Sequence, residues 1–275
     1  MKYSFKDYWT SLARKYDATD SSGFAPVLHP GTPAWFNQII DDLQFQALRR
    51  ALTIATISPG ARLLDVGCGT GRWIRRYREL GFSPVGVDAT FEMLRVARVR
   101  GTRDPLILAL ADCLPFADSQ FDAVSDITVV QHIPYELQTK ALREMVRVLR
   151  PGGRLILLEL VRGSGPHIFT RPPWDWISTV ESCGGTLINY FGQEFRFMDR
   201  FFVRLAQGGS GRTKKARDGV PLNVPASPSG IARGIYWRLR RVTTFFSTLT
   251  EPIFVTVCPA SFATHAVFVF EKRAC

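Results

Sequence analysis

Short apolar runs alternate with amphipathic segments of helical length between residues 62 and 160, and this alternation limits the folds open to the chain. The apolar runs predict five strands, at 62–66, 83–87, 105–111, 121–129 and 154–160. Helical periodicity predicts three helices among them, at 72–80, 91–100 and 135–149. Strands joined through helices form right-handed crossovers, so we expect an α/β protein whose doubly wound, parallel sheet carries helices on both faces.

The two ends of the chain differ from this central part. Residues 1–57 predict two amphipathic helices around a proline- and glycine-rich loop at 23–33. After residue 160 we predict a helix at 172–183, a strand at 186–191, a helix at 198–206, a loop at 207–233, a helix at 234–249 and a strand at 263–271. The chain thus divides into an N-terminal helical lid (1–57), a core (58–197), a basic helical insertion or cap (198–262) and a closing strand of the core (263–275).

The composition is that of a globular protein, because 46% of the 275 residues are apolar and can fill a sizeable core. No stretch approaches the roughly 18 uncharged apolar residues of a spanning helix, and the N-terminus has no apolar core typical of a signal peptide. The five cysteines are an odd number without CxxC spacing, which argues against a disulfide framework and a zinc site. We therefore expect a cytoplasmic protein without a bound metal.

The net charge of +11 is concentrated late in the chain. Residues 200–241 hold ten basic side chains and a single acidic one, Asp218, so this segment carries a charge of +9. Such a segment suits a nucleic acid, a phosphate-bearing molecule or an anionic membrane surface. The remainder of the chain is nearly neutral, so the charge indicates little about the partners of the core.

Three glycines, Gly67, Gly69 and Gly71, stand between the first predicted strand and the helix that follows it. Glycines at such a turn let the backbone adopt positive φ and approach a ligand closely. Nicotinamide-binding enzymes use a related turn, but their pattern needs a further glycine, which residues 72–74 do not supply. The alternative without a ligand is a tight turn whose glycines are incidental.

Acidic residues end two further predicted strands in register with this turn. Asp88 lies 21 residues after Gly67, where a carboxylate can accept hydrogen bonds from both hydroxyls of a ribose. Its alternative role is a helix N-cap. Asp112 ends the third strand, where its carboxylate can accept from an adenine amine and the backbone N–H of Cys113 can donate to a ring nitrogen. Taken alone, Asp112 would be an ordinary loop residue.

The segment from Leu63 to Glu159 resembles class I S-adenosylmethionine-dependent methyltransferases, in particular the enzymes of ubiquinone and menaquinone biosynthesis. The resemblance spans roughly a third of the chain and rests on the stretches 64–71, 87–88, 111–116 with 121–124, and 142–153. It implies a Rossmann-like sheet of seven strands with the last strand antiparallel, and an N-terminal helix carrying Tyr8 and Tyr16 that folds over S-adenosylmethionine.

The same resemblance implies where the cofactor lies. Its methionine end would lie near Asp65 and Gly67, its ribose on Asp88, its adenine between Met93 and the Asp112-Cys113 pair, and its methyl group beside residues 129–132. The cofactor-binding residues implied are Tyr16, Asp65, Gly67, Cys68, Gly69, Asp88, Met93, Asp112, Cys113 and Val129.

Two residues are candidates for a general base. Methyl transfer is an in-line displacement in which alignment and exclusion of water contribute much of the catalysis, and a hydroxyl acceptor adds the need for a base. His132 follows the fourth strand near the expected methyl group; its alternative role is packing in the turn before Pro134. Glu159 ends the fifth strand; its alternative role is to pair with a nearby arginine.

Three hypotheses for the function follow. The first is methyl transfer to a small-molecule, lipid-like or glycan acceptor, favoured by the many aromatic residues outside the core motifs. The second is methyl transfer to RNA or protein; residues 171–174 (Arg-Pro-Pro-Trp) resemble a motif of base methyltransferases but follow the fifth strand instead of the fourth, so we interpret them as a loop before a helix. The third is a non-catalytic cofactor-binding module. The sequence assigns no oligomeric state.

The predicted helix at 234–249 has two interpretations. Its apolar residues recur in steps of four and three on one helical face, at Ile235, Leu239, Val242, Phe246 and Leu249, and arginines flank them. One interpretation is a helix packed on the core with a solvated basic face. The other is a cap over the acceptor pocket whose arginines attract an anionic or membrane-associated substrate, which would bring the protein into peripheral contact with a membrane.

Overall fold

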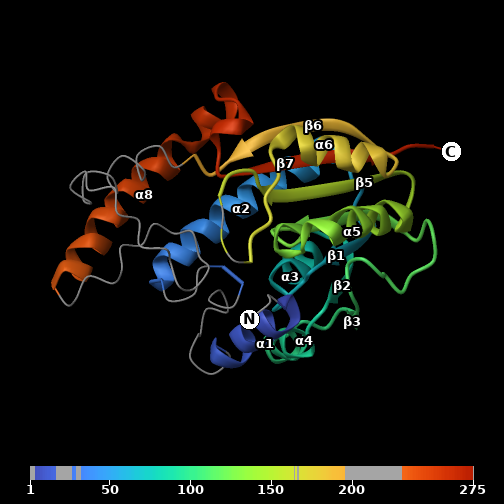
Figure 1. The fold of residues 1–275 in the computed structure, drawn as a ribbon, viewed down its shortest axis with the longest axis horizontal. Coiled ribbons are helices and arrows are strands. Elements are labelled where there is room, and N and C mark those ends of the chain that lie inside the picture. Colours follow the sequence, from blue (N-terminus) through green and yellow to red (C-terminus); the bar gives the residue numbers. More distant parts are fainter. Residues whose placement is uncertain are drawn as a thin grey trace.

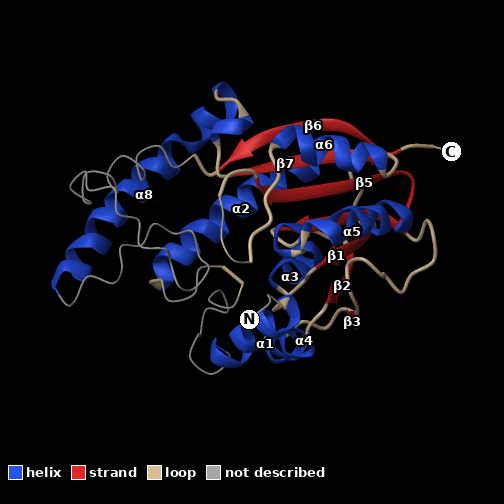
Figure 2. Cartoon of the chain, in the orientation of Figure 1, coloured by secondary structure: helices blue, strands red, loops and turns tan. Residues whose placement is uncertain are grey.

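The computed structural model describes residues 4–16, 27–28, 32–163, 165, 167–195 and 231–274 (Figure 1). The predicted helix at 198–206 and nearly all of the predicted loop at 207–233 lie outside the described residues. The described parts form a central sheet with helices on both of its faces, and α8 extends to one side (Figure 2).

Seven strands make up the sheet, in the order β3-β2-β1-β4-β5-β7-β6. Their bounds are β1 Arg62–Val66, β2 Ser83–Asp88, β3 Leu106–Leu108, β4 Phe121–Ile127, β5 Leu149–Leu160, β6 Gly185–Gln193 and β7 His265–Lys272. The pairs from β3 to β5 are parallel, and β7 runs antiparallel to both β5 and β6. This confirms the predicted doubly wound sheet with an antiparallel last strand.

The helices divide between the two faces. They are α1 Phe5–Tyr16, α2 Ala34–Ala55, α3 Arg72–Glu79, α4 Phe91–Val99, α5 Tyr135–Val148, α6 Pro173–Ser182 and α8 Ile231–Val257. One face of the sheet packs against α5 and α6 in a core that includes Met145, Trp176 and Phe268. The opposite face packs against α2 and α3, with Leu48 and Trp73 buried. Strand residues alternate between these two cores, as the period of two requires.

Some boundaries differ from the prediction. β3 covers three residues instead of the predicted seven, because the chain turns at Leu110, which pairs with Cys113. β5 begins directly after α5, at Leu149, and its register against β4 shifts around Pro151-Gly152-Gly153, so the predicted start at 154 marks only the regular part of the strand. α8 is longer than predicted and runs through Pro252 to Val257.

The predicted lid of residues 1–57 contains two helices with different positions. α2 packs on the sheet, and its Asp41 forms buried ion pairs with Arg72 and Arg76 of α3. α1 instead packs beside α4, where Arg14 pairs with Glu92. The longest helix, α8, runs beside α2 (Figure 1). In the part of the chain that the structure describes, none of the helices combines the length and hydropathy needed to cross a bilayer.

Candidate functional site

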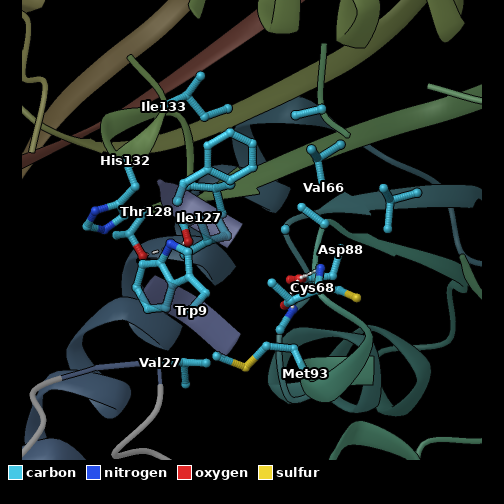
Figure 3. Close-up of a pocket in the computed structure, with 18 of the residues that line it drawn as sticks. Trp9, Val27, Val66, Cys68, Asp88, Met93, Ile127, Thr128, His132 and Ile133 are labelled. Atoms are coloured by element: carbon cyan, nitrogen blue, oxygen red, sulfur yellow. Dashed lines mark hydrogen bonds between the residues drawn. The ribbon is translucent and has the colours of Figure 1, made fainter. Parts of the chain in front are cut away.

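A cavity, partly open to solvent, lies where β1, β2 and β4 end (Figure 3). In the sheet, β2 and β3 lie on one side of β1, and β4 and β5 lie on the other side. The cavity is therefore at the point where the strand order reverses. Ligands of doubly wound sheets bind at such points. The walls of the cavity bring together the turn after β1, the ends of β2 and β4, and α1.

The turn after β1 depends on its glycines. Gly67, Gly69 and Gly71 all have positive φ, at 71°, 51° and 73°. A Cβ added at Gly67 would lie 2.4 Å from a methyl carbon of Val129, the first residue of the turn after β4. The two turns therefore touch at a position that admits no side chain, and residues 67–69 lie on the cavity wall.

Asp88 ties the end of β2 to this turn. Its Oδ2 accepts from the backbone N–H of Gly69 at 2.9 Å, and its Oδ1 accepts from the N–H and the hydroxyl of Thr90 at 2.9 and 2.6 Å. The N-cap of α4 is Thr90, so Asp88 is not the cap. A carboxylate offers about four lone-pair positions, which leaves capacity for a hydroxyl of a ligand. Burial raises the pKa of Asp88 above its usual value, although these three hydrogen bonds oppose the shift.

Asp65 at the end of β1 is buried and only partly satisfied. Ser125 of β4 donates its hydroxyl to Oδ1 at 2.9 Å, while Oδ2 has no hydrogen-bond partner among the described residues. Burial raises the pKa of Asp65 to about 7, and the Ser125 hydrogen bond and the charge of Arg72 act against that increase. A buried carboxylate oxygen without a partner is costly, but Asp65 is not among the residues that line the cavity.

The predicted adenine residues are only partly brought together. Met93, almost fully buried, and Asp112 both line the cavity, and Asp112 also pairs with Lys140 at 3.2 Å. Cys113 departs from the prediction. Its backbone N–H donates to the carbonyl of Leu110 at 3.1 Å, and its exposed side chain is not among the cavity-lining residues. The tight turn after β3 uses the N–H that was expected to face the adenine.

Glu159 lies beneath the cavity instead of in its wall. Its carboxylate is fully buried and accepts three consecutive backbone N–H groups, from Val129 and Val130 at 3.0 Å and from Gln131 at 2.9 Å. Burial raises the pKa values of Glu159 and of its neighbour Asp126 above their usual range. This geometry argues against Glu159 as the general base, because the carboxylate shapes the turn after β4 and does not line the cavity.

His132, the other candidate base, does line the cavity (Figure 3). Its Nδ1 lies 2.9 Å from the carbonyl oxygen of His167, which can only accept, so Nδ1 carries the hydrogen and Nε2 is an acceptor. The side-chain amide of Gln131 lies 3.3 Å from that Nε2. Burial lowers the pKa of His132 to about 3, so the ring is neutral at physiological pH.

Helix α1 closes the cavity with aromatic side chains. Trp9 meets the His132 ring edge-to-face at a centroid distance of 5.0 Å. Tyr8 stacks on His167 at 4.4 Å, and its hydroxyl lies 3.3 Å from His167 Nε2. Burial lowers the pKa of His167 to about 4. Tyr16, the predicted aromatic contact, is the last residue of α1, and its side chain lies outside what the structure describes.

Several cavity residues were not predicted from the sequence, among them Trp9, Phe5 and Arg72. Trp9 and Phe5 contribute apolar walls from α1. Arg72, at the start of α3, also lines the cavity; its guanidinium donates to Asp41 at 2.8 Å, and burial lowers its pKa to about 10. A signal for Arg72 was present, because a cation at a helix N-terminus is unfavourable to the helix dipole and therefore indicates a buried partner.

The Pro-Pro-Trp stretch takes no part in the cavity. α6 begins at Pro173, and Trp174 is exposed on it, away from the cavity-lining residues. This agrees with its interpretation as a loop that enters a helix.

Known proteins resemble both the sequence and the fold. Residues 64–157 match a family described as a methyltransferase domain. The ubiquinone/menaquinone biosynthesis C-methyltransferase of Bordetella avium is 39% identical over 153 residues, which cover 51% of this chain and 57% of that protein. The demethylmenaquinone methyltransferase of Renibacterium salmoninarum is 34% identical over 149 residues, which cover 54% of this chain and 55% of that protein.

The chain therefore spans little more than half the length of these curated relatives. Among solved structures, the 4+2 cyclase SpnF superposes with a TM-score of 0.56 at 21% identity, covering 89% of this chain and 84% of that chain. An identity this low shows the fold alone. Because that protein is named a cyclase, the likeness also illustrates that a shared fold does not determine the reaction.

Proposed function

We propose that the chain is a class I S-adenosylmethionine-dependent methyltransferase, as the methyltransferase-domain match over residues 64–157 supports, and that it transfers a methyl group to a small apolar acceptor and releases S-adenosylhomocysteine. The observation that carries this proposal is the composition of the cavity. One side presents the glycine turn with Asp88, as a nucleoside cofactor requires, and the other side presents apolar and aromatic side chains of α1 and of the turn after β4.

The residues on the cofactor side fit S-adenosylmethionine. The sulfonium supplies an activated methyl group when the cofactor is bound. Asp88 would accept a ribose hydroxyl, and the backbone of Gly67, Cys68 and Gly69 would lie along the methionine end. The Oδ2 of Asp65 lies behind the cavity wall and could accept from the amino group only through a water. Met93 and Asp112 would enclose the adenine, and Val129 would border the methyl group.

The acceptor side favours a flat or lipid-like molecule. Phe5, Trp9, Ile133 and Leu137 line this part of the cavity, and His132 contributes its neutral ring. Two curated relatives are named for methylation of quinone precursors, and an aromatic ring with an apolar chain would suit such walls. We therefore place a phenolic or hydroquinone-like acceptor first among small molecules.

In this proposal His132 accepts the proton, or a hydrogen bond, from the acceptor's nucleophilic group. The depressed pKa keeps Nε2 in the acceptor form, but this nitrogen has one lone pair, which the side-chain amide of Gln131 reaches at 3.3 Å, so the acceptor group would have to displace Gln131. The same low pKa makes the ring a poor final store for a proton, so the proton must pass on to solvent. Glu159 has a supporting role, because it holds the backbone of residues 129–131 beside the methyl group.

The test measures S-adenosylhomocysteine formation with a series of acceptors, first hydroquinones and long-chain phenols, then transfer RNA and a basic protein. Methylation of the phenolic series supports the proposal. Methylation confined to RNA or protein would overturn the acceptor class. Cofactor binding by calorimetry without turnover on any acceptor would favour a binding module or, as in the cyclase neighbour, a different reaction.

The variant His132→Ala tests whether His132 acts as the general base. We expect turnover to fall ~10²-fold while cofactor affinity changes less than about threefold, because the side chain acts on the acceptor. His167→Phe is the matched control, since it preserves the backbone carbonyl that holds His132 Nδ1 and keeps a ring for Tyr8 to stack on. If His132→Ala retains turnover and loses only thermal stability, the residue is a packing element of the turn.

A further inference from the structure

Helix α8 presents its large apolar side chains to solvent. Phe245 is 61% exposed, Phe246 51% and Leu249 64%, and three aliphatic residues on the same helix are equally open. At about 100° per residue, the six apolar residues fall within an arc of about 120°. This apolar stripe consists of Val242, Phe245, Phe246, Leu249, Ile253 and Val257. It is one continuous face of the helix, in contrast to the scattered apolar residues that normal surfaces expose.

The opposite face of α8, which turns toward the protein, combines polar residues with Trp237, Phe254 and Val255, which pack against aromatic and core side chains. Arg240, Thr243, Thr244 and Glu251 are all buried there. The carboxylate of Glu251 accepts the backbone N–H groups of residues 194 and 195, just after β6. These contacts fix the rotation of α8 about its own axis. Turning the helix over would bury the apolar stripe, but the buried charged side chains would lose their partners.

The basic residues that precede the stripe are placed for an anionic surface. Arg238 lies one turn before Val242 on the same side of the helix, Arg241 lies beside it, and both are exposed. From residue 242 to residue 257 the sequence contains one charged residue, Glu251, which faces inward. A helix with basic residues at one end of an exposed apolar stripe matches the interface of a bilayer, where phosphates meet acyl chains.

We infer that α8 is a peripheral membrane-docking helix, which lies in the plane of an anionic phospholipid surface with the apolar stripe inserted and Arg238 and Arg241 at the phosphates. The inference does not depend on the reaction proposed above. The net charge of the chain argues against a second copy of the chain as the molecule that covers the apolar stripe. Each copy carries a net charge of +11, and the exposed Arg238 and Arg241 lie at the end of the stripe in each copy, so two copies would repel where an anionic membrane attracts.

The experiment is sedimentation of the whole protein with vesicles of phosphatidylcholine alone and with vesicles that also contain phosphatidylglycerol. We expect strong binding to the anionic vesicles, weak binding to the neutral ones, and a loss of binding at ~1 M salt, where the Debye length falls to about 3 Å. The double variant Phe245→Ser/Phe246→Ser should weaken binding about tenfold or more for each phenylalanine. Arg238→Gln/Arg241→Gln should weaken it about fivefold for each arginine.

The matched control is Val99→Ser/Trp174→Ser, which removes two equally exposed apolar side chains from α4 and α6 and should leave vesicle binding unchanged. Far-ultraviolet circular dichroism verifies that each variant is folded. Equal binding by the Phe245→Ser/Phe246→Ser variant and the unaltered protein would overturn the inference. So would a stable dimer in analytical ultracentrifugation that this variant converts to a monomer, because the stripe would then be a contact between copies.

Discussion

Helix α5 turns its apolar face to the sheet, whereas helix α8 turns its apolar face away from the protein. In α5, Leu142, Met145 and Val146 are buried among residues of β4, β5 and β7. In α8 the residues of the same character at Phe246 and Leu249 are exposed. Both helices are amphipathic with the period of 3.6, so the period alone does not decide which face is buried.

The two helices differ in the groups of the protein that they pack against. α5 covers a sheet whose strands are apolar on that face, and the hydrophobic effect sets its orientation. α8 approaches a backbone that offers N–H groups just after β6, and Glu251 supplies the carboxylate that these groups need. Where a helix meets unsatisfied backbone, a polar face is the one that packs, and the apolar face is left for another partner.

The largest contrast is expected in unfolding. Leu142→Ala should lower the free energy of unfolding by about 2–5 kcal/mol, since it leaves a cavity in a fully buried site. Phe246→Ala, a larger truncation on the exposed stripe, should change it by no more than about 0.5 kcal/mol. Urea denaturation without lipid measures both values. If Phe246→Ala lowered the free energy of unfolding about as much as Leu142→Ala, the contrast between the two helices would be wrong, because the stripe would then be covered in solution.

The cofactor half should be equally sensitive to a single polar change. Asp88→Ala should weaken S-adenosylmethionine binding tenfold or more, as charge-assisted hydrogen bonds to ribose contribute roughly 1.5–3 kcal/mol. Thr90→Val is the control: it removes a hydrogen bond to the same carboxylate but leaves the acceptor for the ribose. Calorimetry gives both affinities, and thermal melting shows whether the turn survives. Unchanged affinity in folded Asp88→Ala would remove Asp88 from the site.

The features that sequence predicted well are those dictated by neighbouring residues. The strand-helix alternation and the glycines at 67, 69 and 71 express local requirements, namely burial on one face and positive φ, so their positions were foreseeable. The end of β3 was not, because it depends on a turn closed by the Leu110–Cys113 pairing, which also consumes the N–H expected to reach the adenine.

The roles of Glu159 and Trp9 depend on contacts between distant segments. Glu159 ends a strand next to the cavity, as a base would, but three backbone N–H groups 28 to 30 residues earlier need an acceptor there. Trp9 approaches His132 only because α1 docks beside α4, and nothing in the local pattern distinguishes it from Tyr8 or Tyr16. The outward direction of α8 has the same origin, in the backbone after β6.

The smallest expected effect on stability concerns the inward face of α8. Glu251→Gln should lower the free energy of unfolding by about 1 kcal/mol, because it replaces charge-assisted hydrogen bonds to residues 194 and 195 with neutral ones. Glu251→Leu leaves those N–H groups without an acceptor and should cost about 1–3 kcal/mol. Thr250→Ala, one residue away and partly exposed, serves as the control and should cost less than about 0.5 kcal/mol. If Glu251→Leu were instead stabilising, an apolar residue would suit the inward face, and α8 would be free to bury its apolar stripe as α5 does.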